Sequence, residues 1–150
     1  MFVPKANDSI KVYEQKNAIQ KNHELGDYYI TNEYSLSKMK GFTVEPGDII
    51  VSCAGTIGET YVMPKNIELG IINQALMRMN IVKSIDMDYF LLYFDYILKK
   101  SAIEHSKGSA IKNIPPFKIF KRLLMPLPPI NEQKRIIEII KTLKKELDKL

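Results

Sequence analysis

Short alternating segments fill the first half of the chain, and longer helical patterns fill the second half. Residues 10–13 alternate apolar and polar side chains as a strand does, and residues 28–30 and 49–53 predict two further strands. A glycine-containing loop at 54–58 separates residues 49–53 from residues 60–63, which predicts a hairpin. Residues 71–81 predict one more long strand, whereas residues 15–17 and 21–24 are polar and predict loops.

The pattern becomes helical after residue 85. Asp86 is a suitable N-cap for a helix that reaches His105, and the apolar residues around this helix predict that most of it is buried. Tyr89, Tyr93 and Tyr96 form a stripe at helical spacing, which favours packing over stacking on a nucleobase. Gly108 suits the turn that ends such a helix.

A second helix is predicted at the C-terminus, with Asn131 as its N-cap. Its apolar residues recur at the spacing of a coiled-coil seam over about two heptads, and they are Ile136, Ile140, Leu143, Leu147 and Leu150. An isolated helix of this length is marginal in water, so it needs another helix. Residues 1–85 contain no matching seam, and we therefore expect a partner helix from another chain.

Together these elements predict an α+β fold with a mixed or antiparallel sheet and a buried helix, followed by a C-terminal amphipathic coiled-coil helix. We place the domain at residues 1–129 and the helix at 130–150. A length of 150 residues with 45% hydrophobic content fits one domain with its own core.

The charge is unevenly distributed. Residues 1–75 contain 7 Lys against 9 Asp and Glu, and residues 76–150 contain 15 Lys and Arg against 8. This basic second half is compatible with a polyanionic partner, although lysine-rich surfaces are also common in proteins that bind none. No apolar run is long enough to span a bilayer and no signal peptide is evident, so we expect a cytoplasmic protein without membrane contact.

The sequence offers no catalytic or metal-binding constellation. His23 and His105 have no ligand spacing with other residues, and Cys53 lies in an apolar strand. Residues 55–58 lack the ending of a phosphate-binding loop. Asn113 is separated from Pro115 by Ile114, unlike the Asn-Pro-Pro-aromatic motif of amino-methyltransferases. We therefore expect no enzyme activity, no metal and no cofactor.

A binding function remains, and polar or basic residues on predicted loops are its candidates. Asparagine and glutamine pair with adenine, and lysine contacts guanine or phosphate. Each residue alone also fits an ordinary solvated loop. The candidates for DNA contact are Gln15, Lys16, Asn17, Thr56, Lys107, Ser109, Lys112 and Asn113.

Several motifs resemble, in order, those of the target recognition domain in specificity subunits of type I restriction–modification systems. Residues 124–136 (LMPLPPINEQKRI) are similar to the signature that closes this domain. Residues 46–58 resemble its Gly-Asp hairpin. Residues 12–17, 88–94 and 108–114 resemble three further motifs of the family.

The resemblance implies a non-catalytic subunit that reads double-stranded DNA. Such subunits dock methyltransferase (M) subunits, which methylate adenine with S-adenosylmethionine, and the complex recruits a nuclease (R) subunit. Family members carry two recognition domains, whereas this chain matches one, so we expect a half-length subunit or a truncated fragment. A half-length subunit could form a homodimer through its last helix and read a two-fold symmetric site.

Two alternatives remain open. A degenerate specificity fragment would dock methyltransferase subunits through the last helix without reading DNA. An enzyme acting on nucleic acid is disfavoured by the absent catalytic constellation.

Overall fold

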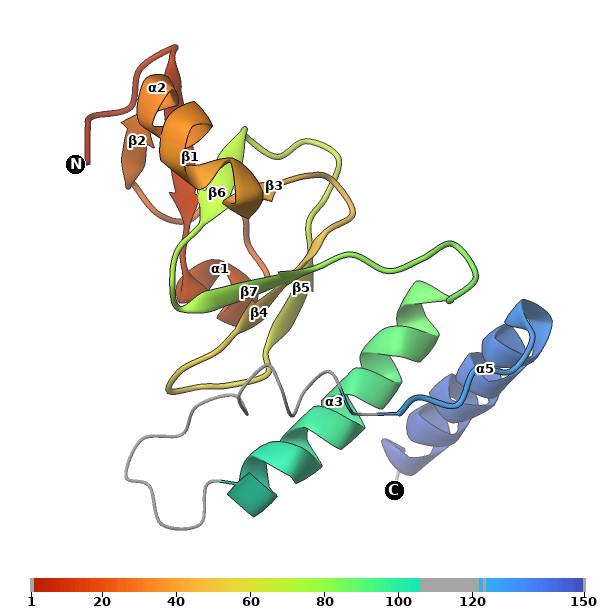
Figure 1. Cartoon of the computed structure of the whole chain (residues 1–150). Helices are drawn as coiled ribbons and strands as arrows, with labels where there is room; N and C mark the ends of the chain where they lie inside the picture. The colour runs from red at the N-terminus through yellow and green to blue at the C-terminus, as the bar shows by residue number, and fades with distance from the viewer. Residues whose placement is uncertain (1, 106–121, 123, 150) are drawn as a thin grey trace. The chain divides into compact units, whose positions relative to one another are not determined.

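The computed structural model describes residues 2–105, 122 and 124–149, and these form two compact units (Figure 1). The first unit contains the described residues up to Asn80, and the second contains the remainder. Lys107, Ser109, Lys112, Asn113 and Leu150 lie outside the described residues, as does the predicted turn at Gly108. The domain boundary that we placed at residue 129 stays a prediction.

Two small β-sheets form the framework of the first unit. The four-stranded sheet has the order β2-β1-β6-β3. Its strands are β1 (Ser9–Tyr13), β2 (Tyr29–Thr31), β3 (Thr43–Val44) and β6 (Gly70–Ile72). The three-stranded sheet is antiparallel and has the order β5-β4-β7. Its strands are β4 (Ile49–Ser52), β5 (Thr60–Val62) and β7 (Leu76–Met79).

Short helices complete the first unit. Helix α1 (Gln15–Ile19) packs against β4 and β5, and a helical segment between β2 and β3 lies beside β1 and β6 (Figure 1). This segment consists of α2 (Asn32–Tyr34), the π-helical turn η1 (Ser35–Met39) and the 3₁₀ turn η2 (Lys40–Phe42). The prediction of a polar loop at residues 15–17 was wrong, because these residues form the first turns of α1.

The alternation of strand β1 divides the core of the first unit in two. Ile10 and Val12 pack with Ile71 of β6, against which Met39 of η1 also lies. Tyr13 belongs to the other cluster, which joins the two sheets and α1. Successive side chains of a strand point to opposite faces, so each face of this sheet is covered by a different layer.

Strand β1 pairs in parallel with β6, and the ring of Tyr13 lies directly on Gly70. A Cβ atom at Gly70 would lie 2.4 Å from Cε2 of Tyr13 and 2.9 Å from the carbonyl oxygen of Lys11. The Tyr13 hydroxyl donates a hydrogen bond of 2.7 Å to the carbonyl of Glu68. Burial raises the pKa of this fully buried phenol above its ordinary value, so the hydroxyl stays a donor.

The strand predicted at residues 71–81 is two strands in different sheets, so that prediction was wrong. The side chain of Asn73 accepts a hydrogen bond of 3.1 Å from the amide of Ala75, and its carbonyl accepts one of 3.1 Å from the amide of Leu76. These bonds close a turn that carries the chain from β6 to β7.

The second unit contains two long helices, α3 (Met87–His105) and α5 (Ile130–Leu147), which pack against each other. Asp86 caps α3 as predicted, because its Oδ1 accepts hydrogen bonds from the amides of Asp88 and Tyr89. Pro129, not Asn131, is the N-cap of α5. The carbonyl of Pro129 already accepts from the amides of Glu132 and Gln133, so the helix begins two residues earlier than a cap at Asn131 predicts.

The proline-rich segment before α5 is held by side chains of both helices. The carbonyls of Leu124 and Pro126 accept hydrogen bonds from the hydroxyls of Tyr93 and Tyr89. The carbonyl of Pro128 accepts one of 2.8 Å from Nε2 of Gln133. Every second carbonyl of this extended segment, from Leu124 to Pro128, therefore accepts a hydrogen bond. Two tyrosines of the predicted stripe, Tyr89 and Tyr93, donate two of these bonds.

Gln133 is fully buried and connects the start of α5 to the start of α3. Its Oε1 accepts a hydrogen bond of 2.8 Å from the amide of Asp86, and its Nε2 also donates to the carbonyl of Ser84 at 3.1 Å. Within the described residues, no helix is long and apolar enough to cross a membrane.

We predict that Gly70→Ala destabilises the protein by about 1–3 kcal/mol, because the added methyl group collides with the Tyr13 ring and the β1 backbone. Gly41→Ala is the matched control, because no atom lies within 4 Å of the methyl group it adds. Urea unfolding followed by circular dichroism measures both. Equal effects for the two variants would contradict the assigned close contact.

We predict that Gln133→Leu costs about 1–3 kcal/mol of unfolding free energy, because the Asp86 amide and two carbonyls lose their buried partner. Lys134→Ala, at the exposed neighbouring position, should change stability by less than about 0.5 kcal/mol. Thermal unfolding of the two variants and the parent chain compares them. A Gln133→Leu variant as stable as the parent would show that the Gln133 hydrogen bonds do not stabilise the second unit.

Candidate nucleic-acid interface

The loop between β4 and β5 carries one of the predicted DNA contacts, Thr56. Ser52, fully buried at the end of β4, organises it through its hydroxyl group. This hydroxyl donates to the carbonyl of Thr56 at 2.5 Å and accepts from the amide of Glu59 at 3.0 Å. The amide of Gly58 bonds the carbonyl of Ser52 at 2.9 Å, so both ends of the loop are fixed.

The tip of this loop is exposed. Gly55 has a φ of 65°, and a Cβ atom at this position would meet open space. A glycine is therefore favoured here by the backbone conformation and not by close packing. The next residue, Thr56, presents its side chain to solvent. The structure therefore places this predicted contact on the accessible tip of a loop whose ends are held by hydrogen bonds.

Helix α1 holds a second predicted contact beside the same loop. Nε2 of Gln15 donates a hydrogen bond of 2.5 Å to the carbonyl of Ala54. This bond joins the start of α1 to the loop, so Gln15 and Thr56, which are far apart in the sequence, belong to one surface. Gln15 thus positions the loop, whatever else it contacts.

Two lysines, one in α1 and one shortly after it, are each paired with an acidic residue. Nζ of Lys16 lies 2.9 Å from Oε2 of Glu14, and this hydrogen bond raises the pKa of Lys16 above its ordinary value. Nζ of Lys21 lies 3.0 Å from Oε2 of Glu59. Both lysine side chains are 42–47% exposed, so these pairs are weak and a phosphate can compete for either cation.

Asn17 has a structural role in place of the predicted contact with DNA. Its side chain is fully buried and accepts a hydrogen bond of 2.7 Å from the amide of Glu14. Its Nδ2 donates to the carbonyls of Asn22 and Leu25 at 2.9 and 2.8 Å. The side-chain oxygen and nitrogen of Asn17 both form hydrogen bonds within the protein, so neither is free to bind a base.

Sequence reasoning missed a charged cluster at the other end of β4. Asp48 is 1% exposed, and its carboxylate accepts hydrogen bonds from Arg78 Nη1 at 3.2 Å, Asn80 Nδ2 at 3.1 Å and the Glu45 amide at 2.8 Å. The Gly-Asp pair in the turn before β4 was visible in the sequence, but its partners lie 30 and 32 residues away. The cluster fixes the turn and leaves the Arg78 guanidinium one-third exposed.

The predicted seam of the last helix divides into two parts. Ile136 and Ile140 line an apolar groove together with Tyr89, Tyr93 and Tyr96 of α3, so their partner helix comes from the same chain. This corrects the expectation that a partner chain would cover the whole seam. Leu143 and Leu147 are 57% and 65% exposed. A coiled coil is therefore not established for α5.

The Cys53 thiol and the His23 imidazole both have structural surroundings that the rest of the protein provides. Burial raises the pKa of the Cys53 thiol to about 11, which disfavours the thiolate at neutral pH. Nδ1 of His23 lies 3.2 Å from the hydroxyl of Tyr61. In the part of the chain that the structure describes, no three His, Cys, Asp or Glu residues are grouped to hold a metal.

Comparisons with known proteins agree with this architecture. The family model of the type I restriction modification DNA specificity domain matches residues 5–150. The type I restriction enzyme MjaVIII specificity subunit of Methanocaldococcus jannaschii is 28% identical over 152 residues, which cover 92% of this chain and 34% of that protein.

Two solved structures share the fold. One is a chain from a study of complex assembly and conformational transition of the type I R-M system, with a TM-score of 0.66, 20% identity and coverage of 98% of this chain and 33% of that one. The other is the HsdS subunit from Thermoanaerobacter tengcongensis, with a TM-score of 0.62, 18% identity and coverage of 95% and 32%.

The chain thus spans about a third of the length of these relatives. The family model, by contrast, covers nearly all of the chain, and it confirms the resemblance drawn from the motifs. The protein belongs to the family of type I restriction–modification DNA specificity domains.

Proposed function

We propose that this chain reads DNA sequence as a non-catalytic specificity element of a type I restriction–modification system. The observation that carries the proposal is the match of the DNA specificity family to residues 5–150. The match favours DNA reading over the alternative of a docking module that ignores DNA. In this role the chain directs methyltransferase and nuclease subunits to a site and performs no chemistry itself.

The loop between β4 and β5 is our candidate for a DNA contact within the described residues. It is held by Ser52 and Gln15, it presents Thr56 at an exposed tip, and the half-exposed Lys21 pairs with Glu59 at its end. A loop fixed before binding loses little conformational entropy when it meets DNA. Lys107, Ser109, Lys112 and Asn113 remain candidates on the basis of the sequence alone.

The exposed end of α5 is our candidate for helix docking. Ile139, Leu143 and Leu147 are each more than 40% exposed, although all are large apolar residues. A helix that leaves such residues uncovered fits a second helix, either from another copy of this chain or from another subunit.

A binding selection tests the function directly. The tagged chain is co-purified with the methyltransferase subunit of its host and incubated with a random library of DNA duplexes. We expect one sequence to be enriched through successive rounds. Recovery of the methyltransferase subunit without any enriched sequence would instead support the docking module.

We predict that Lys107→Ala with Lys112→Ala weakens DNA binding and reduces the slope of log K against log salt by about 2, because two phosphate contacts are lost. The measurement is a titration of labelled duplex at several salt concentrations. Lys65→Ala with Lys83→Ala removes the same charge from two exposed positions elsewhere in the sequence and is the control. If both double variants weakened DNA binding equally, the effect would come from the net charge of the protein and not from contacts of Lys107 and Lys112 with phosphate.

We predict that Leu143→Glu with Leu147→Glu prevents assembly without unfolding the chain, because both side chains are exposed in the isolated protein. Ile140→Glu should reduce thermal stability as well, because Ile140 faces α3. Sedimentation velocity and thermal unfolding separate the two effects. Unchanged assembly in the Leu143 and Leu147 variant would exclude this end of α5 as a docking surface.

A further inference from the structure

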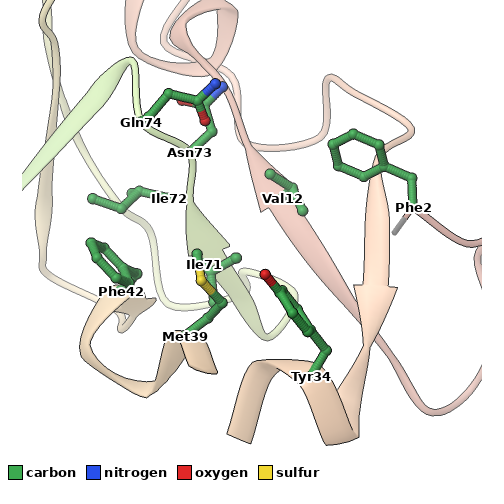
Figure 2. A pocket seen from close by; sticks show the side chains of 9 residues that line it. All are labelled: Phe2, Val12, Tyr34, Met39, Phe42, Ile71, Ile72, Asn73 and Gln74. Carbon is green, nitrogen blue, oxygen red and sulfur yellow. The ribbon is translucent and has the colours of Figure 1, made fainter. Parts of the chain in front are cut away.

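A pocket of about 320 Å³ in the first unit is not explained by the loop described above. Figure 2 shows that β1 and β6 supply its floor with Val12 and Ile71, while the helical segment supplies Tyr34 and Phe42. Val12 and Ile71 are buried, whereas Tyr34 and Phe42 are 44% and 47% exposed. The pocket therefore has an aliphatic floor and aromatic walls that are open to solvent.

Two amide side chains, Asn73 and Gln74, line the same pocket at the end of β6, away from Tyr34 (Figure 2). Oδ1 of Asn73 accepts a hydrogen bond of 3.1 Å from the amide of Ala75, which fixes the plane of its side chain. Its Nδ2 has no hydrogen-bond partner in the described part of the chain, and the side chain of Gln74 is exposed. A few oriented polar groups on an apolar pocket are typical of a ligand site.

The segment that supplies the aromatic walls also carries two cations. Lys38 and Lys40 flank Met39 in η1 and η2, and both are exposed. Neither forms an ion pair with the residues that the structure describes, whereas Lys5, Lys16 and Lys21 all do. A ligand that matches this surface has a flat apolar face, a hydrogen-bonding edge and a negative charge beside it.

We propose that the pocket receives one unstacked nucleobase of the bound DNA. Tyr34 and Phe42 offer rings on which a base stacks, and stacking on aromatic side chains stabilises unpaired bases in other proteins. Asn73 and Gln74 offer amides to its edge, and such amides pair best with adenine. Lys38 and Lys40 do not line the pocket itself, but they are exposed on the segment that supplies its rings and offer positive charge to phosphates nearby.

This inference rests on the proposed function and adds a ligand class to it. An apolar anchor from a protein partner would also fit the floor and walls. It would leave the amides of Asn73 and Gln74 unpaired and the two lysines without a counter-charge. A nucleobase and the phosphates beside it account for both amides and both lysines, so we favour this ligand.

The test uses the complex with its methyltransferase subunit and the DNA duplex that it selects. Each adenine of that duplex is replaced in turn by 2-aminopurine, whose fluorescence changes when the base leaves its stack. We expect one position whose signal depends on Phe42, and Phe42→Ala should also weaken binding by about 5- to 100-fold. Gln74→Ala should weaken binding to that duplex more than to one with another base at the same position.

Leu36→Ala is the matched control, because Leu36 is an exposed apolar residue of the same segment that does not line this pocket. It should leave both the signal and the affinity unchanged. An adenine that flips into the methyltransferase gives a signal that persists in Phe42→Ala, so the two kinds of extrusion are separable. Circular dichroism verifies that each variant is folded.

Two results overturn the inference while the proposed function stands. One is unchanged DNA affinity and fluorescence in Phe42→Ala. The other is loss of the methyltransferase subunit from the Phe42→Ala complex, which would make the pocket a protein-docking site. Failure of the parent complex to bind any DNA would overturn the proposed function, and the inference would fall with it.

Discussion

The contact between the Tyr13 ring and Gly70 is the constraint on which the first unit depends. It lets β1 lie in parallel beside β6, although most of the first unit lies between these strands in the sequence. A parallel pair requires a long crossover, and here the crossover contains the helical segment and strands β3, β4 and β5. The backbone of Asn73 then bonds the carbonyl of Tyr13 at 3.1 Å, which fixes where β6 ends and the turn begins. This close approach thus places the turn that leads into β7 of the second sheet and carries Asn73 to the pocket.

Buried hydrogen bonds play the corresponding part in the second unit. Gln133 joins the start of α3, the proline-rich segment and the start of α5 through one amide group. Prolines in that segment leave carbonyls without helical partners, and Tyr89 and Gln133 supply donors for them. The motif that most resembles the family signature thus acts as a structural clamp in this chain. This explains why a glutamine, and not an apolar residue, occupies a fully buried position of α5.

A rigid scaffold with exposed loops and pockets is suited to reading DNA, because specificity requires groups held in place before binding. In the first unit, Ser52 and Gln15 fix one loop, and a hydrogen bond within the β6–β7 turn fixes the Asn73 amide that lines the pocket. Asp48 secures the opposite end of β4 through Arg78 and Asn80. The polar residues inside this unit therefore serve the shape of the surface, whereas exposed residues remain available to a ligand.

Local patterns in the sequence determined most of the elements and the family. The strands at residues 9–13 and 49–52, the Asp86 cap and the helix to His105 follow from alternation and capping, which depend on near neighbours. Only the tertiary structure decided that Asn17 is buried, that residues 71–81 divide between two sheets, and that α3 covers Ile136 and Ile140. These outcomes depend on partners far away in the sequence, such as Tyr13 for Asn73 or α3 for α5. Local spacing carries no information about those contacts, because they are fixed by which distant surfaces bury each other.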